Sequence, residues 1–327
     1  MSEEVHTSLN HEKSGLDTIK TNKEIRINVL NPDNSDPLRI GPRFTLSNST
    51  LGRLEKLAKA RFTLGQIVGY DLNDWFLSEE LHLAVAQSIN ASSAIEGEGI
   101  HVDRLSLILN AVTNPDYGIR NTELTVREKT FGTIYQACFW ALKKDWAKFL
   151  SYDFVLELHQ RMFSTTNPEI AGKIKTKPVS IKGAGYNIQT LPPEKCELFL
   201  RKLCARVNDG LEDARDNSTA SMFLIIAEFI SDFLAIHPFS DGNGRTARLL
   251  STYLLEKAGY GFAKFYPLDS IIFETREKYY YVLFHSQKNW YQSDEDLSLW
   301  IGYYTESIFN QFIRAYMRAQ DEAVQKK

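Results

Sequence analysis

The chain has 327 residues with 43% hydrophobic side chains, which is enough for one large domain or two ordinary domains with a substantial core. Its 38 lysines and arginines nearly balance 41 aspartates and glutamates, so the formal net charge is −3. A charge this close to neutral argues against a nucleic-acid-binding surface or a polybasic membrane patch. We therefore expect a globular protein with no nucleic-acid partner and no membrane partner, in which any bound anion is held locally.

We also expect no export signal and no membrane span. The first thirty residues lack the apolar core of a signal peptide. The apolar stretch 222–236 is interrupted by Glu228 and Asp232, whereas a membrane helix needs about 18 or more apolar residues in a row. A cytoplasmic location is the expectation. The cysteines are odd in number and lack metal-ligand spacing, which favours reduced thiols at Cys138, Cys196 and Cys204.

Most of the chain has the apolar periodicity of helices. Residues 1–45 are polar and turn-rich, which predicts a tail or arm that docks on the body. Apolar side chains then recur every three or four residues on both sides of a loop around Gly69 and Asp71, with stripes at 54–62 and 77–89. Further helices are predicted at 122–143, 152–163, 193–207, 219–236, 244–258, 276–287 and 297–317.

Residues 174–188 are the exception. Val179 and Ile181 alternate with polar residues before a Gly-Ala-Gly turn, which is a hairpin signature. No repeat of 20 to 50 residues is present, so a solenoid is not expected. The predicted fold class is mainly α, a helical bundle with one short β-hairpin.

The segment 237–248, His-Pro-Phe-Ser-Asp-Gly-Asn-Gly-Arg-Thr-Ala-Arg, collects the residues of a phosphate-handling site. Pro238 ends the preceding helix, so His237 lies at the rim of a loop. The loop opens a new helix, whose free N–H groups and dipole favour an anion. Gly242 and Gly244 allow those amides to approach the anion closely.

The charged residues of this segment favour a polyphosphate. Arg245 and Arg248 share one face of the first helical turn, and each can hold phosphate oxygens. Asp241 suits Mg²⁺, which commonly combines one or two carboxylates with substrate phosphates. His237 can accept a proton from a hydroxyl that attacks phosphorus. An ordinary turn beside a structural histidine is the alternative, but it does not explain the order of these groups.

The segment resembles the Fic-family motif HPFx(D/E)GNGRxxR and matches it at every fixed position. Most Fic proteins are AMPylators, which transfer AMP from ATP to a Tyr, Thr or Ser hydroxyl of a target protein. The resemblance implies a Fic-fold bundle with the hairpin as a flap over the active site. It further implies a general base at His237, an Mg²⁺ ligand at Asp241, an anion hole at Gly242, Asn243 and Gly244, and contacts to the β- and γ-phosphates from Arg245 and Arg248.

A second motif lies upstream, at Ser92-Ser-Ala-Ile-Glu-Gly97. It places Glu96 at the end of a helix, before a glycine able to end it. By itself this is a solvent-facing glutamate. The segment resembles the (S/T)xxxE(G/N) motif of Fic proteins with an N-terminal inhibitory helix, in which the glutamate pairs with the second motif arginine, here Arg248, and prevents productive seating of the γ-phosphate. Glu98 is a near neighbour, but spacing from Ser92 favours Glu96.

The resemblance also assigns the hairpin and its approach. A Fic hairpin aligns the target by strand addition, which implies a docking edge at Val179, Ser180 and Ile181. The family often has Gly-x-x-Arg before this hairpin, whereas this chain has Lys175 in place of the arginine. A lysine there lacks the planar fork needed for bidentate contacts.

Downstream, Tyr280 and Gln287 resemble the region where some Fic proteins place an aromatic ring and an amide against adenine. Those proteins usually have Asn at the position of Gln287. Tyr280 as a core residue is the alternative, because aromatic side chains on helices usually pack. The resemblance is specific only over 92–97 and 237–248.

We expect four regions. A polar tail spans 1–45, and an N-terminal helical region with the inhibitory motif spans 46–115. A Fic core with the flap and the active-site motif spans 116–265, and C-terminal helices packed on that core span 266–327. The predicted function is an autoinhibited protein adenylyltransferase that uses ATP and Mg²⁺ and modifies a target protein and itself, with release of pyrophosphate.

Three alternatives stay open. The same site could remove AMP from a modified protein, with Glu96 positioning water, or it could use another nucleotide or phosphate donor. The chain could instead be a non-catalytic nucleotide-sensing module that presents helix 297–317 and the tail to a partner. The sequence does not identify the target protein. It also leaves the oligomeric state open, and an oligomer is possible.

Overall fold

The computed structural model describes residues 43–68, 79–113, 123–143, 150–183, 186–217, 219–264, 266–288, 290 and 294–325. Residues 1–42 of the predicted tail and the predicted loop around Gly69 and Asp71 lie outside these. The described chain is helical apart from one two-stranded sheet, which confirms the predicted fold class. Among the described residues, no helix has both the length and the apolar character that crossing a bilayer requires.

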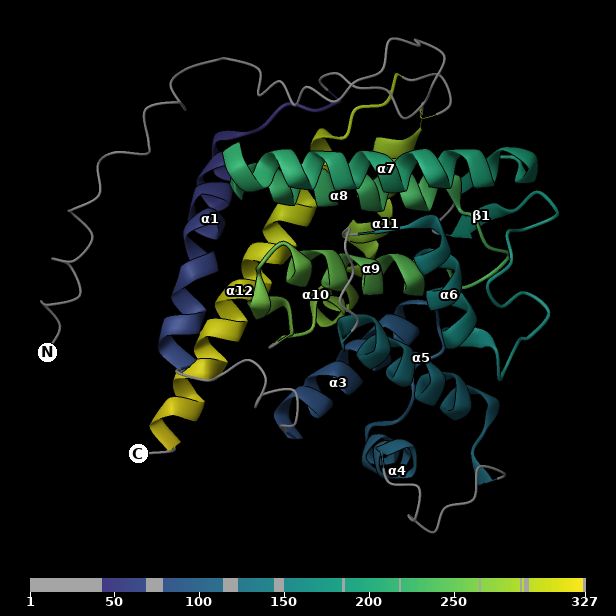
Figure 1. Ribbon diagram of the computed structural model, residues 1–327, viewed down its shortest axis with the longest axis horizontal. Helices are drawn as coiled ribbons and strands as arrows, with labels where there is room; N and C mark the ends of the chain where they lie inside the picture. Colours follow the sequence, from purple (N-terminus) through teal and green to yellow (C-terminus); the bar gives the residue numbers. More distant parts are fainter. Residues whose placement is uncertain are drawn as a thin grey trace, which may run out of the picture.

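Helix α8 (Thr219–Ile236) forms the centre of the core because it is apolar on nearly every side. From Met222 to Ile236 only Glu228 is not fully buried. Helix α7 (Pro193–Asn217) lies along α8, and α9 (Asn243–Lys257) packs beneath it (Figure 1). Helices α5 (Val126–Lys143) and α6 (Tyr152–Phe163) pack against each other beside α9. The loop between α8 and α9 contains the motif, so both of its flanking helices are anchored in the core.

The C-terminal helices α11 (Arg276–Gln287) and α12 (Ser298–Gln325) also pack on α8. Helix α12 pairs with α1 (Asn48–Val68), and both appear at the left of Figure 1. Between α9 and α12 lie η2 (Gly261–Lys264), α10 (Leu268–Glu274) and α11. Helix α10 is absent from the helices predicted from the sequence, because seven residues are too few to show a helical period.

Helix α3 (Glu79–Ile95) lies across α5, α9 and α10, with Leu81, Val85 and Ile89 buried. These side chains belong to the predicted apolar stripe, of which Leu77 lies outside the described residues. The structure adds α4 (Val102–Thr113), which the sequence analysis also missed, and which packs on α5. The end of α3 therefore reaches the N-terminus of α9, where the motif is.

The predicted hairpin is present but shorter than 174–188. Strands β1 (Ser180–Gly183) and β2 (Tyr186–Gln189) pair antiparallel, with Ile181 opposite Ile188. The preceding residues instead tie the hairpin to the end of α8. The buried Lys175 ammonium donates to Thr190 Oγ1 (2.7 Å) and to the Ile236 carbonyl (3.3 Å), and its backbone N–H donates to the Pro238 carbonyl (2.8 Å). Lys175 thus has a structural role for which a single ammonium is sufficient.

The three cysteines are buried and free, which confirms the prediction of reduced thiols at Cys138, Cys196 and Cys204. Burial raises the pKa of Cys138 and of Cys204 to about 12. Both thiols are therefore protonated near neutral pH and chemically inert.

A buried ion cluster joins the start of the described chain to the core. The Arg43 guanidinium contacts both carboxylate oxygens of Asp232 (2.6 and 2.8 Å) and one of Glu295 (2.7 Å). Arg206 and the Trp290 indole also contact Asp232. Burial alone would raise the pKa of Asp232, but Arg43 and Arg206 lower it to about 2. The segment before α1 is thereby fixed to α8.

Because Arg43 has no solvent-exposed side-chain area, its removal takes away the ion-pair partner of the buried Glu295 and leaves the buried Asp232 with Arg206 alone. We expect Arg43→Ala to lower the free energy of unfolding by about 3–5 kcal/mol, measured by urea denaturation. Arg53→Ala is the control, since Arg53 is partly exposed and its carboxylate partner Glu306 is 3.9 Å away. Its effect should be about 0–1 kcal/mol. Equal losses in the two variants would contradict the importance of the cluster.

Candidate active site

His237 lies where α8 ends, in a backbone conformation uncommon for its residue type. Its φ of 51° is in the left-handed region, at a position where the backbone N–H still donates to the Phe233 carbonyl (2.9 Å). The Nδ1 atom is 3.2 Å from the Leu234 carbonyl, which can only accept, so Nδ1 carries the proton. The lone pair is then on Nε2. Burial lowers the pKa of His237 to about 4, which keeps the ring neutral at pH 7.

The loop after His237 presents free amides at the start of α9. The first hydrogen bond of α9 runs from the Thr246 N–H to the Gly242 carbonyl (2.9 Å), so the amides before Thr246 have no partner within the helix. Gly242 has a φ of 78°, and a Cβ there would lie 2.5 Å from the ring of Phe163. Only glycine fits this position. The arrangement has the geometry of an anion cradle at a helix N-terminus.

Asn243 stabilises the loop through its side chain. The amide oxygen accepts from the Phe239 N–H (2.9 Å), and the amide nitrogen donates to the Phe239 carbonyl (2.8 Å). Its side chain is therefore not available to an anion. The predicted role of Asn243 in the anion hole then depends on its backbone N–H alone.

Arg248 is buried on α9 and is held from two sides. Its Nε donates to Ser92 Oγ (2.8 Å), and its Nη2 donates to the Ser92 carbonyl (2.9 Å) and to Glu96 Oε1 (2.9 Å). From the other side, Asp269 Oδ1 of α10 lies 3.1 Å from Nε. The buried Nη1 has no hydrogen-bond partner among the described residues, and it lies 3.0 Å from the position that a Cβ on Gly244 would take.

The Glu96 carboxylate occupies the mouth of the anion cradle. A Cβ on Gly244 would lie only 2.3 Å from Glu96 Oε1. Glu96 is the residue that follows α3, and Gly97 after it has a φ of 79°. The Gly97 N–H donates to the Ala94 carbonyl (3.1 Å) and the Glu98 N–H to the Ser93 carbonyl (2.8 Å), the two hydrogen bonds of a Schellman motif. This helix end fixes Glu96 against α9.

Arg245 and Asp241 lie at the outer side of the loop. Arg245 Nη1 contacts Glu98 Oε2 (2.5 Å), and Nη2 contacts Asp241 Oδ2 (3.3 Å). Asp241 Oδ1 accepts from the Gly242 N–H (2.6 Å), and the side chain is exposed. No group of three or more metal-ligating side chains occurs in the described part of the chain. A single exposed carboxylate beside an anion cradle fits Mg²⁺ that is shared with substrate phosphates.

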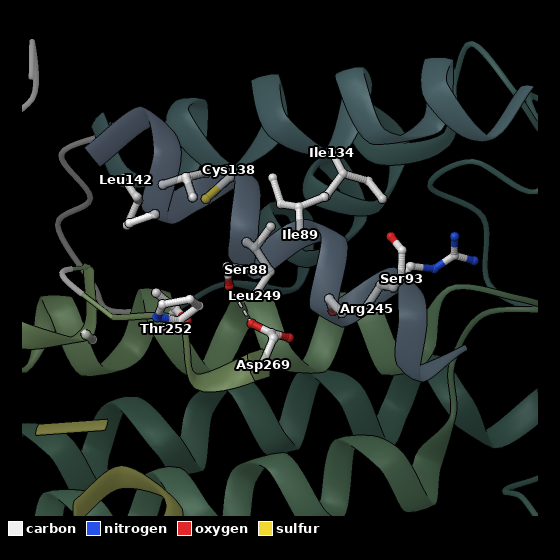
Figure 2. A pocket seen from close by; sticks show the side chains of 15 residues that line it. Ser88, Ile89, Ser93, Ile134, Cys138, Leu142, Arg245, Leu249, Thr252 and Asp269 are labelled. Carbon is white, nitrogen blue, oxygen red and sulfur yellow. Dashed lines mark hydrogen bonds between the residues drawn. The ribbon is translucent and has the colours of Figure 1, made fainter. Parts of the chain in front are cut away.

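A small cavity lies between α3 and helices α5, α9 and α10. Figure 2 shows Ser88 of α3 facing Asp269, with apolar Ile89, Ile134 and Leu249 around them. Ser88 Oγ donates to Asp269 Oδ2 (2.6 Å). Asp269 therefore contacts both Arg248 and the helix that delivers Glu96.

His159 of α6 is a site residue that the sequence analysis missed. It is fully buried and stacks on Phe239 with ring centroids 3.7 Å apart. Its Nδ1 accepts from the Gly172 N–H (3.0 Å), so Nε2 carries the proton and donates to the Asp241 carbonyl (3.0 Å). His159 thus fixes the backbone of the loop. An amphipathic helix with a histidine on its apolar face was the available signal, but it does not identify the partner.

Of the two residues predicted to contact adenine, only Tyr280 lies near the motif. Its hydroxyl donates to the Ile95 carbonyl (3.3 Å), next to Glu96. Gln287 is buried, and its amide nitrogen donates to the Ser231 carbonyl (2.7 Å) within the packing of α11 on α8. The predicted adenine contact of Gln287 therefore has no support, because its amide group is used inside the core.

The predicted docking edge is partly used within the hairpin. The Val179 carbonyl accepts from both the Thr190 N–H (3.3 Å) and Thr190 Oγ1 (2.6 Å), so it faces β2. Backbone groups alternate in direction along a strand, and Ile181 therefore also faces β2. Of the three residues, Ser180 is the one that directs its backbone groups toward the open edge.

The fold and the site together define a helical protein with a neutral histidine and an anion cradle between its two central helices. Residues 149–255 match the model of the Fic/DOC family. The matched residues run from α6 to α9 and include the hairpin. Residues 149–255 of the chain therefore contain a Fic domain.

Solved structures share the fold over most of the chain. A Fic family protein from Desulfovibrio desulfuricans G20 superposes with a TM-score of 0.63 and 21% identity, over 85% of this chain and 77% of the other. A Fic-1 fragment from C. elegans gives a TM-score of 0.59 and 22% identity, over 84% and 74%. At these identities the similarity is evidence of a shared fold.

Two curated relatives share sequence over a shorter region. A protein from Caenorhabditis briggsae named protein adenylyltransferase fic-1 is 33% identical over 133 residues, which is 40% of this chain and 23% of the relative. One from Drosophila willistoni named protein adenylyltransferase Fic is 33% identical over 130 residues, 39% of this chain and 23% of the relative. The matched region thus spans less than a quarter of each relative's length.

The two buried histidines predict how stability depends on pH. Burial lowers the pKa of His159 to about 4, below its unfolded value of about 6.5. The unfolded chain therefore binds more protons in this range, so the stability present above pH 6.5 is lost as the pH falls toward 4. We expect His159 alone to contribute a loss on the order of 3 kcal/mol over this range, measured by urea denaturation.

A His159→Gln variant should be less stable at pH 7 and should lose this part of the pH dependence, because glutamine does not titrate. The exposed His285, substituted in the same way, is the control and should leave the curve unchanged. A wild-type slope retained in full by His159→Gln would show that His159 is not the titrating group.

Proposed function

We propose that the chain is an autoinhibited protein adenylyltransferase, which transfers AMP from ATP to a Tyr, Thr or Ser hydroxyl of a target protein and of itself. One observation carries the proposal: the Glu96 carboxylate lies over Gly244 beside the unpartnered Nη1 of Arg248. A buried guanidinium N–H without a partner is costly, and a phosphate at the cradle would satisfy it. The carboxylate and the phosphate compete for the same place.

The transfer step follows from the groups around the loop. The target hydroxyl loses its proton to Nε2 of His237, its oxygen bonds to the α-phosphorus, and the bond from that phosphorus to the bridging oxygen breaks. Pyrophosphate leaves with that electron pair, and the proton stays on His237. A neutral imidazole with a free Nε2 supports this role.

The amides at the start of α9 would hold the α-phosphate, and Arg245 and Arg248 the outer phosphates. Mg²⁺ at Asp241 would offset the negative charge of those phosphates. Tyr280, next to Glu96, is positioned to contact the base or to restrain the inhibitory turn. Ser180 is proposed as the backbone contact for a target strand.

In this proposal ATP still binds to the inhibited protein, but its phosphates are held out of alignment for transfer. Phosphoryl-type transfer depends on an in-line arrangement of the attacking and leaving oxygens. With Arg248 paired to Glu96, the terminal phosphate of ATP cannot reach that arginine, so the α-phosphate is held in the wrong orientation. Residues 46–115 then act as an inhibitory region upstream of the core 116–265, with 266–327 as supporting helices.

The decisive experiment labels ATP in turn on the α- and the γ-phosphate and compares wild type, Glu96→Gly, His237→Ala and the double variant Glu96→Gly/His237→Ala. We expect label from the α-phosphate only, a rise of about tenfold or more in Glu96→Gly, and loss of label in Glu96→Gly combined with His237→Ala. His285→Ala in the Glu96→Gly background is the matched control and should keep the rate, because His285 is exposed on α11.

Label from the γ-phosphate would indicate a kinase instead. No label in any variant would favour a nucleotide-sensing module, or removal of AMP from a modified protein with Glu96 positioning water. Incubation of the wild type with an AMPylated protein separates these two, because only the hydrolase releases AMP.

A further inference from the structure

Each motif arginine is paired with two carboxylates of different origin. One belongs to the body of the site: Asp269 for Arg248, and Asp241 for Arg245. The other comes from the turn that ends α3: Glu96 for Arg248, and Glu98 for Arg245. The spacing from Ser92 favoured Glu96 over its near neighbour Glu98, yet Glu98 Oε2 lies 2.5 Å from Arg245 Nη1, closer than Glu96 lies to Arg248.

The Arg245 side chain has little freedom to serve another ligand while this contact exists. Only 4% of it is exposed, and its guanidinium lies over the ring of Phe163 at 4.8 Å. Its Nη1 contacts Glu98, its Nη2 contacts Asp241, and its buried Nε has no hydrogen-bond partner among the described residues. A phosphate that approaches Arg245 through Nη1 must therefore displace Glu98 or share that nitrogen with it.

The backbone around Glu98 is held in place by α3. The Glu98 N–H donates to the Ser93 carbonyl (2.8 Å), and Asn90 clamps Ile100 through both its N–H (2.7 Å) and its carbonyl (3.0 Å). A Cβ on Gly99 would lie 2.9 Å from the Ala94 side chain, so this stretch packs directly on the helix. Glu98 is thus delivered to the site by the same rigid unit as Glu96.

We propose that Glu98 is a second inhibitory carboxylate, which withholds Arg245 from the nucleotide phosphates while Glu96 withholds Arg248. This proposal rests on the proposed function. The two contacts occupy different arginines, so removal of Glu96 alone leaves Arg245 paired with Glu98. Glu98 is 42% exposed, and solvent screens its ion pair, so its effect is smaller than that of Glu96.

The test measures the affinity for Mg·ATP by calorimetry in wild type, Glu98→Gln, Glu96→Gly and Glu96→Gly/Glu98→Gln. We expect Glu98→Gln to tighten Mg·ATP binding by about fivefold in either background. Binding of adenosine should not change, because it has no phosphate to reach Arg245. Glu98→Ala, which also removes the remaining hydrogen-bond acceptor, should match or exceed Glu98→Gln.

Glu197→Gln is the matched control, since Glu197 pairs with Arg201 at 2.9 Å on the distant helix α7 and its loss should leave Mg·ATP affinity unchanged. Incorporation of label from α-labelled ATP should be greater in the double variant than in Glu96→Gly. Unchanged Mg·ATP affinity in both Glu98 variants would overturn the proposal. The affinity reports on Glu98 even if no variant transfers AMP, so failure of the proposed function gives a different result.

Discussion

The arrangement of the site depends on the position of the Arg248 guanidinium. It is buried on α9, and its charge is compensated by carboxylates from α10 and from the end of α3. Removal of a buried charge from all its partners is expensive, so Arg248 requires at least one of them at all times. Asp269 fulfils this requirement from within the fold. Under the proposed function, the Glu96 carboxylate is therefore the partner that a phosphate would replace, because Asp269 keeps the arginine paired.

The long helices and the residues of 237–248 could be predicted from the sequence, because both depend on local patterns. Helix α8 is apolar on nearly every side, and Pro238 marks its end. Helices α4 and α10 were missed: α10 spans only seven residues, and neither was recognised from its apolar pattern. The position of Glu96 near Arg248 could be proposed only from a family resemblance, since 152 residues separate the two.

Other contacts had no local signal. His159, Asp269 and Lys175 each bind an atom far away in sequence, so their partners follow from the packing of helices and not from spacing. Gln287 shows the limit of prediction from a family resemblance. It was expected to contact adenine, but its amide nitrogen donates to the buried Ser231 carbonyl instead. The side chain of Asn243 likewise serves the loop rather than the anion.

Gly97 gives the turn after α3 a particular geometry. It is the left-handed residue between the two carboxylates of the turn, and a Cβ there would contact nothing within 4 Å. The hydrogen bonds of Glu98 with Ser93 and of Ile100 with Asn90 tie the backbone after Gly97 to α3, so the two carboxylates keep a fixed position relative to each other. Under the proposed function, a displacement of the end of α3 would therefore release both arginines together.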